Sequence, residues 1–170
     1  MWAKQDIKSG LIIKKASKEH FADWAQLMHD YFAYYKFEYM GDHLEKTFEK
    51  IISDNPEIYS FVAYIDGNIS GIANYLFHPS TFVGNECYLS DLFVSVDYRG
   101  CGVARKLIEN VRKMAILHDA TELYWVTELE NQAAINLYDK IAIKNNEWAR
   151  YEIDLNPLAD DSLNIPETSK

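Results

Sequence analysis

Apolar residues recur along this chain with two different spacings, and each spacing predicts a different kind of element. Recurrence every three or four positions predicts helices over about residues 18–37, over 42–53, after residue 103 and after residue 131. Short runs rich in β-branched and aromatic residues predict strands at Leu11–Lys15, Ile58–Ile65, Ile69–Phe77, Glu86–Val96, Leu123–Thr127 and Trp148–Asp154. Between two of these runs, Asp66-Gly67 is a strong signal for a tight hairpin.

The order of these elements predicts one α/β domain built around a single mixed sheet. Two helices follow the first strand, a run of strands joined by short turns comes next, and a strand–helix–strand–helix–strand succession ends the domain. A strand, a crossover helix and another strand imply a parallel step within the sheet. We expect this domain to span residues 1–155 and to be followed by a polar, flexible tail over 156–170.

Charge narrows the classes of partner. The 170 residues include 17 Lys and Arg against 26 Asp and Glu, a net charge of -9. Broad nucleic-acid binding depends on neutralising phosphates, so this balance argues against it. A cationic partner would be attracted by such a field, although an acidic surface also serves solubility alone.

Cysteine usage and the ends of the chain bear on its compartment. Cys87 and Cys101 are the two cysteines, and their spacing is not typical of a metal site or a disulfide framework. The start of the sequence lacks the apolar core of a signal peptide, and no apolar run approaches the length of a membrane span. We therefore expect a soluble cytoplasmic protein that binds neither membrane nor nucleic acid.

The stretch DYRGCGVARK, Asp97–Lys106, contains the most informative local chemistry. It follows a strand and opens a helix, where backbone N–H groups and the positive end of the helix dipole can bind an anion. Gly100 and Gly102 would let the backbone approach a phosphate closely, and Arg99 adds a positive charge. No Gly-Lys-Ser/Thr follows, so the pattern of nucleotide hydrolases is excluded.

This stretch and a second one resemble the GNAT superfamily of N-acetyltransferases. LFVSVDYRGCGVARKLIENV is similar to the acetyl-CoA motif of that family, Arg/Gln-x-x-Gly-x-Gly/Ala, through Arg99, Gly102 and Ala104. TELENQAAINLYDKIA, Thr127–Ala142, is similar to the second family motif, an Asn-capped helix that carries a tyrosine. The resemblance implies the GNAT fold over about residues 11–154, with a V-shaped splay between the fourth and fifth strands. It also implies acetyl-CoA as cosubstrate, no metal, and a homodimer.

The resemblance further implies roles for individual residues in binding coenzyme A. The strand backbone that pairs with the pantetheine arm corresponds to Leu92, Phe93 and Val94. The pyrophosphate cradle corresponds to Arg99, Gly100, Cys101, Gly102, Val103 and Ala104, with Arg105 as an additional contact. Asn131 corresponds to a residue that contacts the cofactor arm, and Tyr138 to the tyrosine near the sulfur that protonates the departing thiolate.

The chemistry of amine acetylation requires such groups. An alkylammonium with a pKa of about 10.4 must lose a proton before it attacks, and a thiol with a pKa of about 8.5 leaves more easily beside an acid. Asp91, on the strand next to the reactive end, is our candidate for holding the amine or relaying its proton through water. The alternatives are a solvated strand residue for Asp91 and a core aromatic for Tyr138. The family transfers acetyl directly, so Cys101 is expected to be a small loop residue and not a nucleophile.

The acceptor amine stays open between two branches of the family. KFEYM, Lys36–Met40, resembles the spermidine/spermine and thialysine acetyltransferases, where a glutamate and an acidic strand residue bind the cationic amine. Glu38 matches that glutamate, but Ser90 stands where those enzymes have the acidic strand residue, a glutamate, which argues against polyamine specificity although Asp91 lies next to it. The stretch from LYWVTELENQ to RYEIDL is closer to the branch that acetylates histones, polyamines and D-amino acids.

The prediction is therefore an acetyl-CoA-dependent N-acetyltransferase acting on a small cationic amine such as a polyamine or an amino-acid-like compound. A protein, peptide or aminoglycoside amine is the alternative acceptor. A catalytically silent acetyl-CoA sensor is the alternative function, and the intact tyrosine argues against it.

Overall fold

The computed structural model describes residues 10–37, 41–147 and 149–152, and it contains one mixed sheet with helices on both faces. The strands are β1 (Leu11–Lys15), β2 (Tyr59–Ile65), β3 (Asn68–Ser80), β4 (Gly84–Val94) and β5 (Glu122–Tyr124). The α-helices are α1 (Phe21–Tyr34), α2 (His43–Ile51), α3 (Val103–Leu117) and α4 (Gln132–Tyr138), with short 3-10 turns at Lys18–His20 and Val96–Tyr98. Glu38, the expected tail over 156–170 and residues 1–9 lie outside the described residues.

The strands lie in the order β1-β2-β3-β4-β5, and every pair is antiparallel except β4 with β5. The parallel step follows from the crossover through α3, as the order of elements predicts. Asp66 and Gly67 both have positive φ, 51° and 84°, which is the geometry of a type I′ turn. The expected hairpin between β2 and β3 is therefore confirmed.

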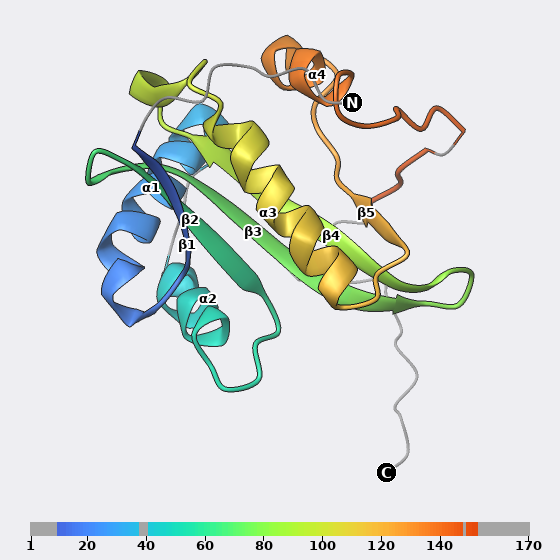
Figure 1. Cartoon of the computed structure of the whole chain (residues 1–170), viewed down its shortest axis with the longest axis horizontal. Coiled ribbons are helices and arrows are strands. Elements are labelled where there is room, and N and C mark those ends of the chain that lie inside the picture. Colours follow the sequence, from blue (N-terminus) through green and yellow to red (C-terminus); the bar gives the residue numbers. More distant parts are fainter. Residues whose placement is uncertain (1–9, 38–40, 148, 153–170) are drawn as a thin grey trace, which may run out of the picture.

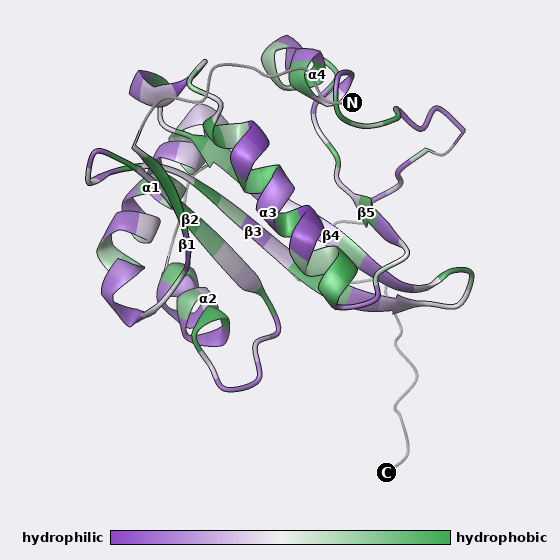
Figure 2. Cartoon of the chain, viewed as in Figure 1, coloured by the Kyte–Doolittle hydropathy of each residue, from purple (hydrophilic) through white to green (hydrophobic). Residues whose placement is uncertain are grey.

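Two apolar clusters hold the layers together, one on each face of the sheet. On one face α3 packs on the sheet through Val103, Leu107 and Val111, all almost fully buried. On the other, α1 and α2 pack around Trp24 and Phe48. Figure 1 shows α3 lying along the sheet, with α1 and α2 grouped at the opposite end from β5 and α4. In Figure 2 hydrophobic colour concentrates on the central strands, while hydrophilic positions mark the outer turns of α2 and α3.

Two expected elements differ from the structure. The strand expected over Leu123–Thr127 ends at Tyr124, because its pairing with β4 stops there. The strand expected over Trp148–Asp154 is absent at residues 149–152, and the rest of that run lies outside the described residues. Tyr151 is 91% exposed, so the alternating pattern that suggested this strand has no apolar surface to pack against there.

Candidate active site

A divergence between β4 and β5 opens a groove at one end of the sheet. The two strands pair only from Glu86–Glu122 to Tyr88–Tyr124, while β4 continues to Val94. After Tyr124 the chain leaves the sheet and reaches α4 through residues 125–131. This is the V-shaped splay that the family fold implies, and it separates the C-terminal end of β4 from α4.

The groove has a volume of about 320 Å³ and is lined from four directions. The end of β4, the loop before α3, the C-terminal part of α1 and the helix α4 all contribute. Its lining includes most of the residues that the family motifs predict: Leu92, Phe93, Val94, Arg99, Gly100, Val103, Ala104, Asn131 and Tyr138. Residues as far apart in sequence as Tyr31 and Lys140 thus meet around one space.

The loop between β4 and α3 has the backbone geometry that its glycines predict. Gly100 has φ 76° and Gly102 has φ 80°, both in the left-handed region that disfavours side chains. Gly102 is the residue directly before α3, and the first turn of this 15-residue helix contains no acidic side chain. The start of α3 can therefore face an anion without a competing carboxylate from its own first turn.

Arg99 folds back over the groove instead of extending into solvent. Its Nε donates to the Val94 carbonyl oxygen at 3.2 Å. Its guanidinium carbon lies 5.4 Å from the ring centre of Tyr34 and 5.9 Å from that of Phe93. These distances are within the range of cation–π attraction, so Arg99 connects the glycine loop to α1 and β4.

Tyr138 lies on the far wall of the groove, at the end of α4. Its ring packs edge-on against Trp125 with 5.2 Å between the ring centres. Burial, followed by the nearby Tyr35, raises the pKa of Tyr138 to about 12. The hydroxyl therefore carries its proton at neutral pH and can donate a hydrogen bond.

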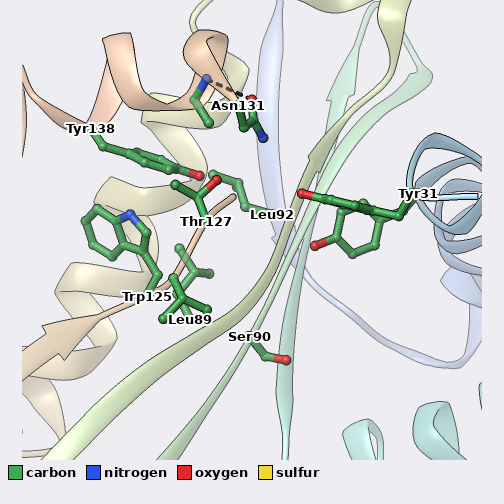
Figure 3. A pocket seen from close by; sticks show the side chains of 11 residues that line it. Tyr31, Leu89, Ser90, Leu92, Trp125, Thr127, Asn131 and Tyr138 are labelled. Atoms are coloured by element: carbon green, nitrogen blue, oxygen red, sulfur yellow. Dashed lines mark hydrogen bonds between the residues drawn. The ribbon is translucent and has the colours of Figure 1, made fainter. Parts of the chain in front are cut away.

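Asn131 fixes α4 in place and also reaches the aromatic residues of α1. Its side-chain oxygen accepts from the backbone N–H of Ala134 at 3.2 Å, which is the expected helix cap. Asn131 also forms a side-chain hydrogen bond with Tyr35, which in turn is hydrogen-bonded to Tyr31. Figure 3 shows Tyr31 and Tyr138 directed toward each other from opposite sides of β4, with Leu92 between them.

Asp91 lies on the face of β4 turned toward α1 and does not line the groove. Its Oδ2 accepts from Asn74 Nδ2 at 3.0 Å and from Ser90 Oγ at 3.2 Å. Burial raises the pKa of the Asp91 carboxyl, while the two donors act in the opposite direction. Asp91 in turn contributes to the raised pKa of Tyr31, a lining residue, so its charge is felt at the edge of the groove. A fully solvated strand residue would have neither feature.

The other predicted site residues lie near the groove but outside its lining. Gly102 supplies the turn into α3, and Cys101 is half-buried against the core cluster beneath that helix. Arg105 is 7% exposed on α3. Tyr31 and Tyr35 also line the groove, and together with Trp125 and Thr127 they line a smaller pocket next to it; none of the four was among the predicted site residues. The helical spacing of Tyr31 and Tyr35 was visible, but nothing local indicated that α1 would face α4.

Two further properties concern the described residues alone. Within them no group of three or more His, Cys, Asp and Glu side chains is arranged to hold a metal ion. None of the helices found in these residues combines the length and apolarity that crossing a bilayer requires.

Comparison with known proteins agrees with this geometry. A curated relative, the thialysine N-epsilon-acetyltransferase of Caenorhabditis elegans, is 28% identical over 74% of this chain and 84% of its own. The D-amino-acid N-acetyltransferase of Saccharomyces cerevisiae is 29% identical over 82% of this chain and 89% of its own. A solved aminoglycoside N-acetyltransferase, in complex with a bisubstrate analogue of coenzyme A, superposes with a TM-score of 0.75 at 22% identity, covering 86% and 99% of the two chains.

A sequence model of the acetyltransferase (GNAT) family matches residues 23–142, which include every residue that lines the groove. The match spans well over half of the chain and both motifs identified from the sequence. This protein is therefore an N-acetyltransferase of the GNAT family.

Proposed function

We propose that this enzyme transfers acetyl from acetyl-CoA directly to the amino group of a small cationic acceptor. The observation that carries the proposal is the arrangement around the end of β4. The protonated hydroxyl of Tyr138 lies on the groove side of this strand, and the carboxylate of Asp91 lies on its other face. A hydrogen-bond donor for the departing sulfur and a carboxylate that can take a proton are thus placed on the two faces of the same end of β4, and transfer from a thioester to an amine uses both.

The groove suits coenzyme A, the acetyl carrier that the family uses. The backbone of Leu92, Phe93 and Val94 lines the space that β5 leaves open, where an extended pantetheine arm would pair with it. The glycine loop and the start of α3 would hold the pyrophosphate, with Arg99 released from the Val94 carbonyl to pair with a phosphate. Acetyl-CoA supplies the activated acyl group, and the chain supplies the orientation.

The proposed reaction needs one group that removes protons from nitrogen and another that stabilises the departing sulfur. The amine nitrogen forms a bond to the acetyl carbon while the carbon–sulfur bond breaks. An ammonium group loses two protons on becoming an amide, one before it attacks and one after the new bond forms; one of them ends on the sulfur of free coenzyme A and the other in solvent. We assign the removal of protons from nitrogen to Asp91, acting directly or through water, and the stabilisation of the departing sulfur to Tyr138. A tyrosine with a pKa of about 12 is a weaker acid than a thiol with a pKa of about 8.5, so Tyr138 acts chiefly as a hydrogen-bond donor to the departing sulfur.

A small cationic amine is the acceptor that the charge and the relatives favour. The chain has a net charge of -9, and Asp91 places a carboxylate next to the groove. The two curated relatives described above are named for thialysine and for D-amino acids, both small compounds that carry an amino group. Glu38, whose position lies outside the described residues, remains a proposed second carboxylate for the acceptor. We also propose that the enzyme is a homodimer, which light scattering would test.

Release of free thiol from acetyl-CoA in the presence of an amine panel tests this proposal. The panel should contain polyamines, thialysine and lysine, D-amino acids, an aminoglycoside and a peptide amine. We expect the highest kcat/KM with a small amine bearing a second positive charge, and a preference that weakens as salt screens the carboxylates. Acetyl-CoA binding without thiol release for any amine would contradict the proposal, and a peptide as best substrate would overturn the assigned acceptor class.

A further inference from the structure

A chain of buried hydrogen bonds reaches Asp91 from the interior of the protein. The Trp24 indole Nε1 donates to Asn74 Oδ1 at 3.0 Å, and Asn74 Nδ2 donates to Asp91 Oδ2 at the same distance. Asn74 Nδ2 also donates to the Met28 sulfur at 3.5 Å. Trp24 is fully buried and Asn74 is 1% exposed, so neither side chain can touch an acceptor molecule. Among the predicted site residues, Asp91 is the one that this chain of hydrogen bonds reaches.

The identity of the donors fixes the orientation of the Asn74 amide. An indole N–H can only donate, so the atom of Asn74 that faces Trp24 must be the oxygen. The nitrogen is then directed at Asp91, where a carboxylate can only accept. A flipped amide would oppose two donors at Trp24 and two acceptors at Asp91. The indole thus determines which end of Asn74 the catalytic carboxylate meets.

An asparagine at position 74 would cost stability if its side chain served only to fill the core. Its strand neighbours Ile72, Ala73 and Tyr75 are all buried, and the cluster around it contains Trp24, Met28 and Phe93. A buried amide costs free energy unless its polar atoms find partners, and an apolar residue would avoid that cost. The amide is fully partnered only because Trp24 and Asp91 stand on its two sides.

The groups that stabilise the charged form of Asp91 are neutral hydrogen-bond donors. The groups that act on the pKa of Asp91 are Asn74 from β3 and Ser90 from its own strand, both lowering it against the effect of burial. From α1 the titratable neighbour is Tyr31, and α2 contributes the apolar Leu44, Phe48 and Ile51 to this side of the sheet. Among the described residues, no cation contributes to the shift at Asp91.

We propose that Asn74 and Trp24 are positioning residues of this acetyltransferase, which hold the Asp91 carboxylate turned so that its second oxygen faces the acceptor. Asn74 and Ser90 both donate to Asp91 Oδ2, which anchors the carboxylate by one oxygen and leaves Oδ1 to bind the ammonium group or take its proton. The inference rests on the proposed role of Asp91 and adds the device that orients it.

The test measures the titration of Asp91 directly and compares it with turnover. The variants are Asn74→Leu, which keeps the volume and removes the donor, and Trp24→Phe, which keeps a ring in the core and removes the indole N–H. Ser70→Ala is the matched control, because Ser70 is a fully buried polar residue of the same strand whose hydroxyl donates to the Ala63 carbonyl. Carboxyl ¹³C NMR of the enzyme without acceptor reports the pKa, and the acid limb of kcat/KM reports its catalytic use.

In Asn74→Leu we expect the Asp91 pKa to rise by about one unit relative to wild type, since a hydrogen bond to the charged form is lost. The acid limb of kcat/KM should move by the same amount, and Trp24→Phe should shift both in the same direction by less. Ser70→Ala should shift neither. In an Asp91→Asn background, Asn74→Leu should leave the remaining kcat/KM unchanged, because the two residues act as one unit.

Two results would overturn the inference, and they differ in what else they overturn. If the Asp91 pKa is the same in Asn74→Leu, Trp24→Phe and Ser70→Ala, the positioning role fails while the proposed reaction stands. If Asp91→Asn retains wild-type kcat/KM, the proposed role of Asp91 fails and the positioning role fails with it, whatever the NMR titration shows. Trp24→Phe keeps the first test available if Asn74→Leu does not fold.

Discussion

Replacing Gly71 with alanine should lower the stability of the protein and its affinity for acetyl-CoA together. Gly71 lies in β3 opposite Val94, beneath the first turn of α3. A Cβ at this position would lie 2.9 Å from the Phe93 carbonyl oxygen, 2.9 Å from Val103 Cγ1 and 3.2 Å from Leu107 Cδ1. The nearest contact is to backbone, which cannot rotate away as a side chain can. The end of β4 and the start of α3 must therefore move away from β3.

The magnitude follows from two opposing effects. Overpacking a close-packed core costs about 1–3 kcal/mol, and an alanine gains back about 0.4–1 kcal/mol by restricting the unfolded chain. Two contacts of 2.9 Å put the cost in the upper part of that range, so we expect a net loss of about 1–2 kcal/mol. For a chain of this size that corresponds to a fall in Tm of about 2–8 °C. Calorimetry would measure the fall in Tm and the affinity for acetyl-CoA on the same samples.

Two further variants separate this reasoning from general destabilisation. Val111→Ala removes a fully buried side chain of α3 that is not part of the groove, so it should lower Tm without weakening acetyl-CoA binding. Val103→Ala removes one of the two closest contacts, so Gly71→Ala should cost less in that background than alone. An unchanged Tm in Gly71→Ala, or strictly additive losses with Val103→Ala, would refute the packing argument.

Three more predictions concern the chemistry of the groove. Gly102→Glu should weaken acetyl-CoA binding by about tenfold or more, measured by calorimetry, because a carboxylate and an unfavourable φ of 80° enter the proposed phosphate cradle; unchanged affinity would exclude the cradle. Tyr138→Phe should lower kcat by about 10²-fold with little change in acetyl-CoA affinity, and wild-type kcat should show no loss from Tyr138 ionisation below about pH 10, because its pKa is about 12. Asp91→Asn should lose activity yet raise Tm at neutral pH. The pKa of Asp91 is raised in the folded protein, so folding favours the protonated carboxyl, and its ionisation costs stability as pH rises above the ordinary pKa of 3.8. A lower Tm of this variant at neutral pH would contradict this sign.

The parts of the fold that the sequence could predict are those that depend on local chemistry. The Asp66-Gly67 hairpin, the glycine loop before α3 and the Asn131 cap each follow from residues adjacent in sequence, and each has the expected geometry. Most residues that the two family motifs assign to coenzyme A line one groove, because both motifs are contiguous, and their roles stay predictions. The expected strand over Trp148–Asp154 is wrong at residues 149–152, since an alternating pattern shows that a strand could form and not that a partner is present.

The parts that escaped prediction depend on contacts between distant segments. Tyr35 meets Asn131, and Trp24 meets Asn74 across a separation of 50 residues. Asn74 looks like an isolated polar residue within an apolar strand, and only the fold reveals its two partners. Asp91 was identified as a candidate from its position, but its orientation away from the groove was not, because that depends on an irregularity in β4.

That irregularity leads to a prediction about how the groove opens. In the register of β3 with β4, Asn74 faces Asp91 and Tyr75 faces Leu89, so Ser90 is an extra residue that forms a β-bulge. Because of it, Leu89 and Leu92 both pack on the α3 side while Asp91 turns toward α1. Bulges bend a strand and increase its twist, and pairing between β4 and β5 stops at Tyr88, directly before this one.

Deleting Ser90 should therefore straighten β4 while keeping Asp91 on the face of α1, since regular alternation from Leu89 then places it there. We expect β4 to follow β5 further, the groove to narrow, and acetyl-CoA affinity to fall by about tenfold or more, which corresponds to about 1.4 kcal/mol. Ser90→Ala is the matched control, because it keeps the bulge and removes only the hydroxyl that donates to Asp91. Calorimetry would measure acetyl-CoA affinity in both variants. If the deletion variant folds and binds acetyl-CoA as tightly as Ser90→Ala does, the bulge does not open the groove. The divergence of β4 from β5 must then come from α4 and the segment that leads to it.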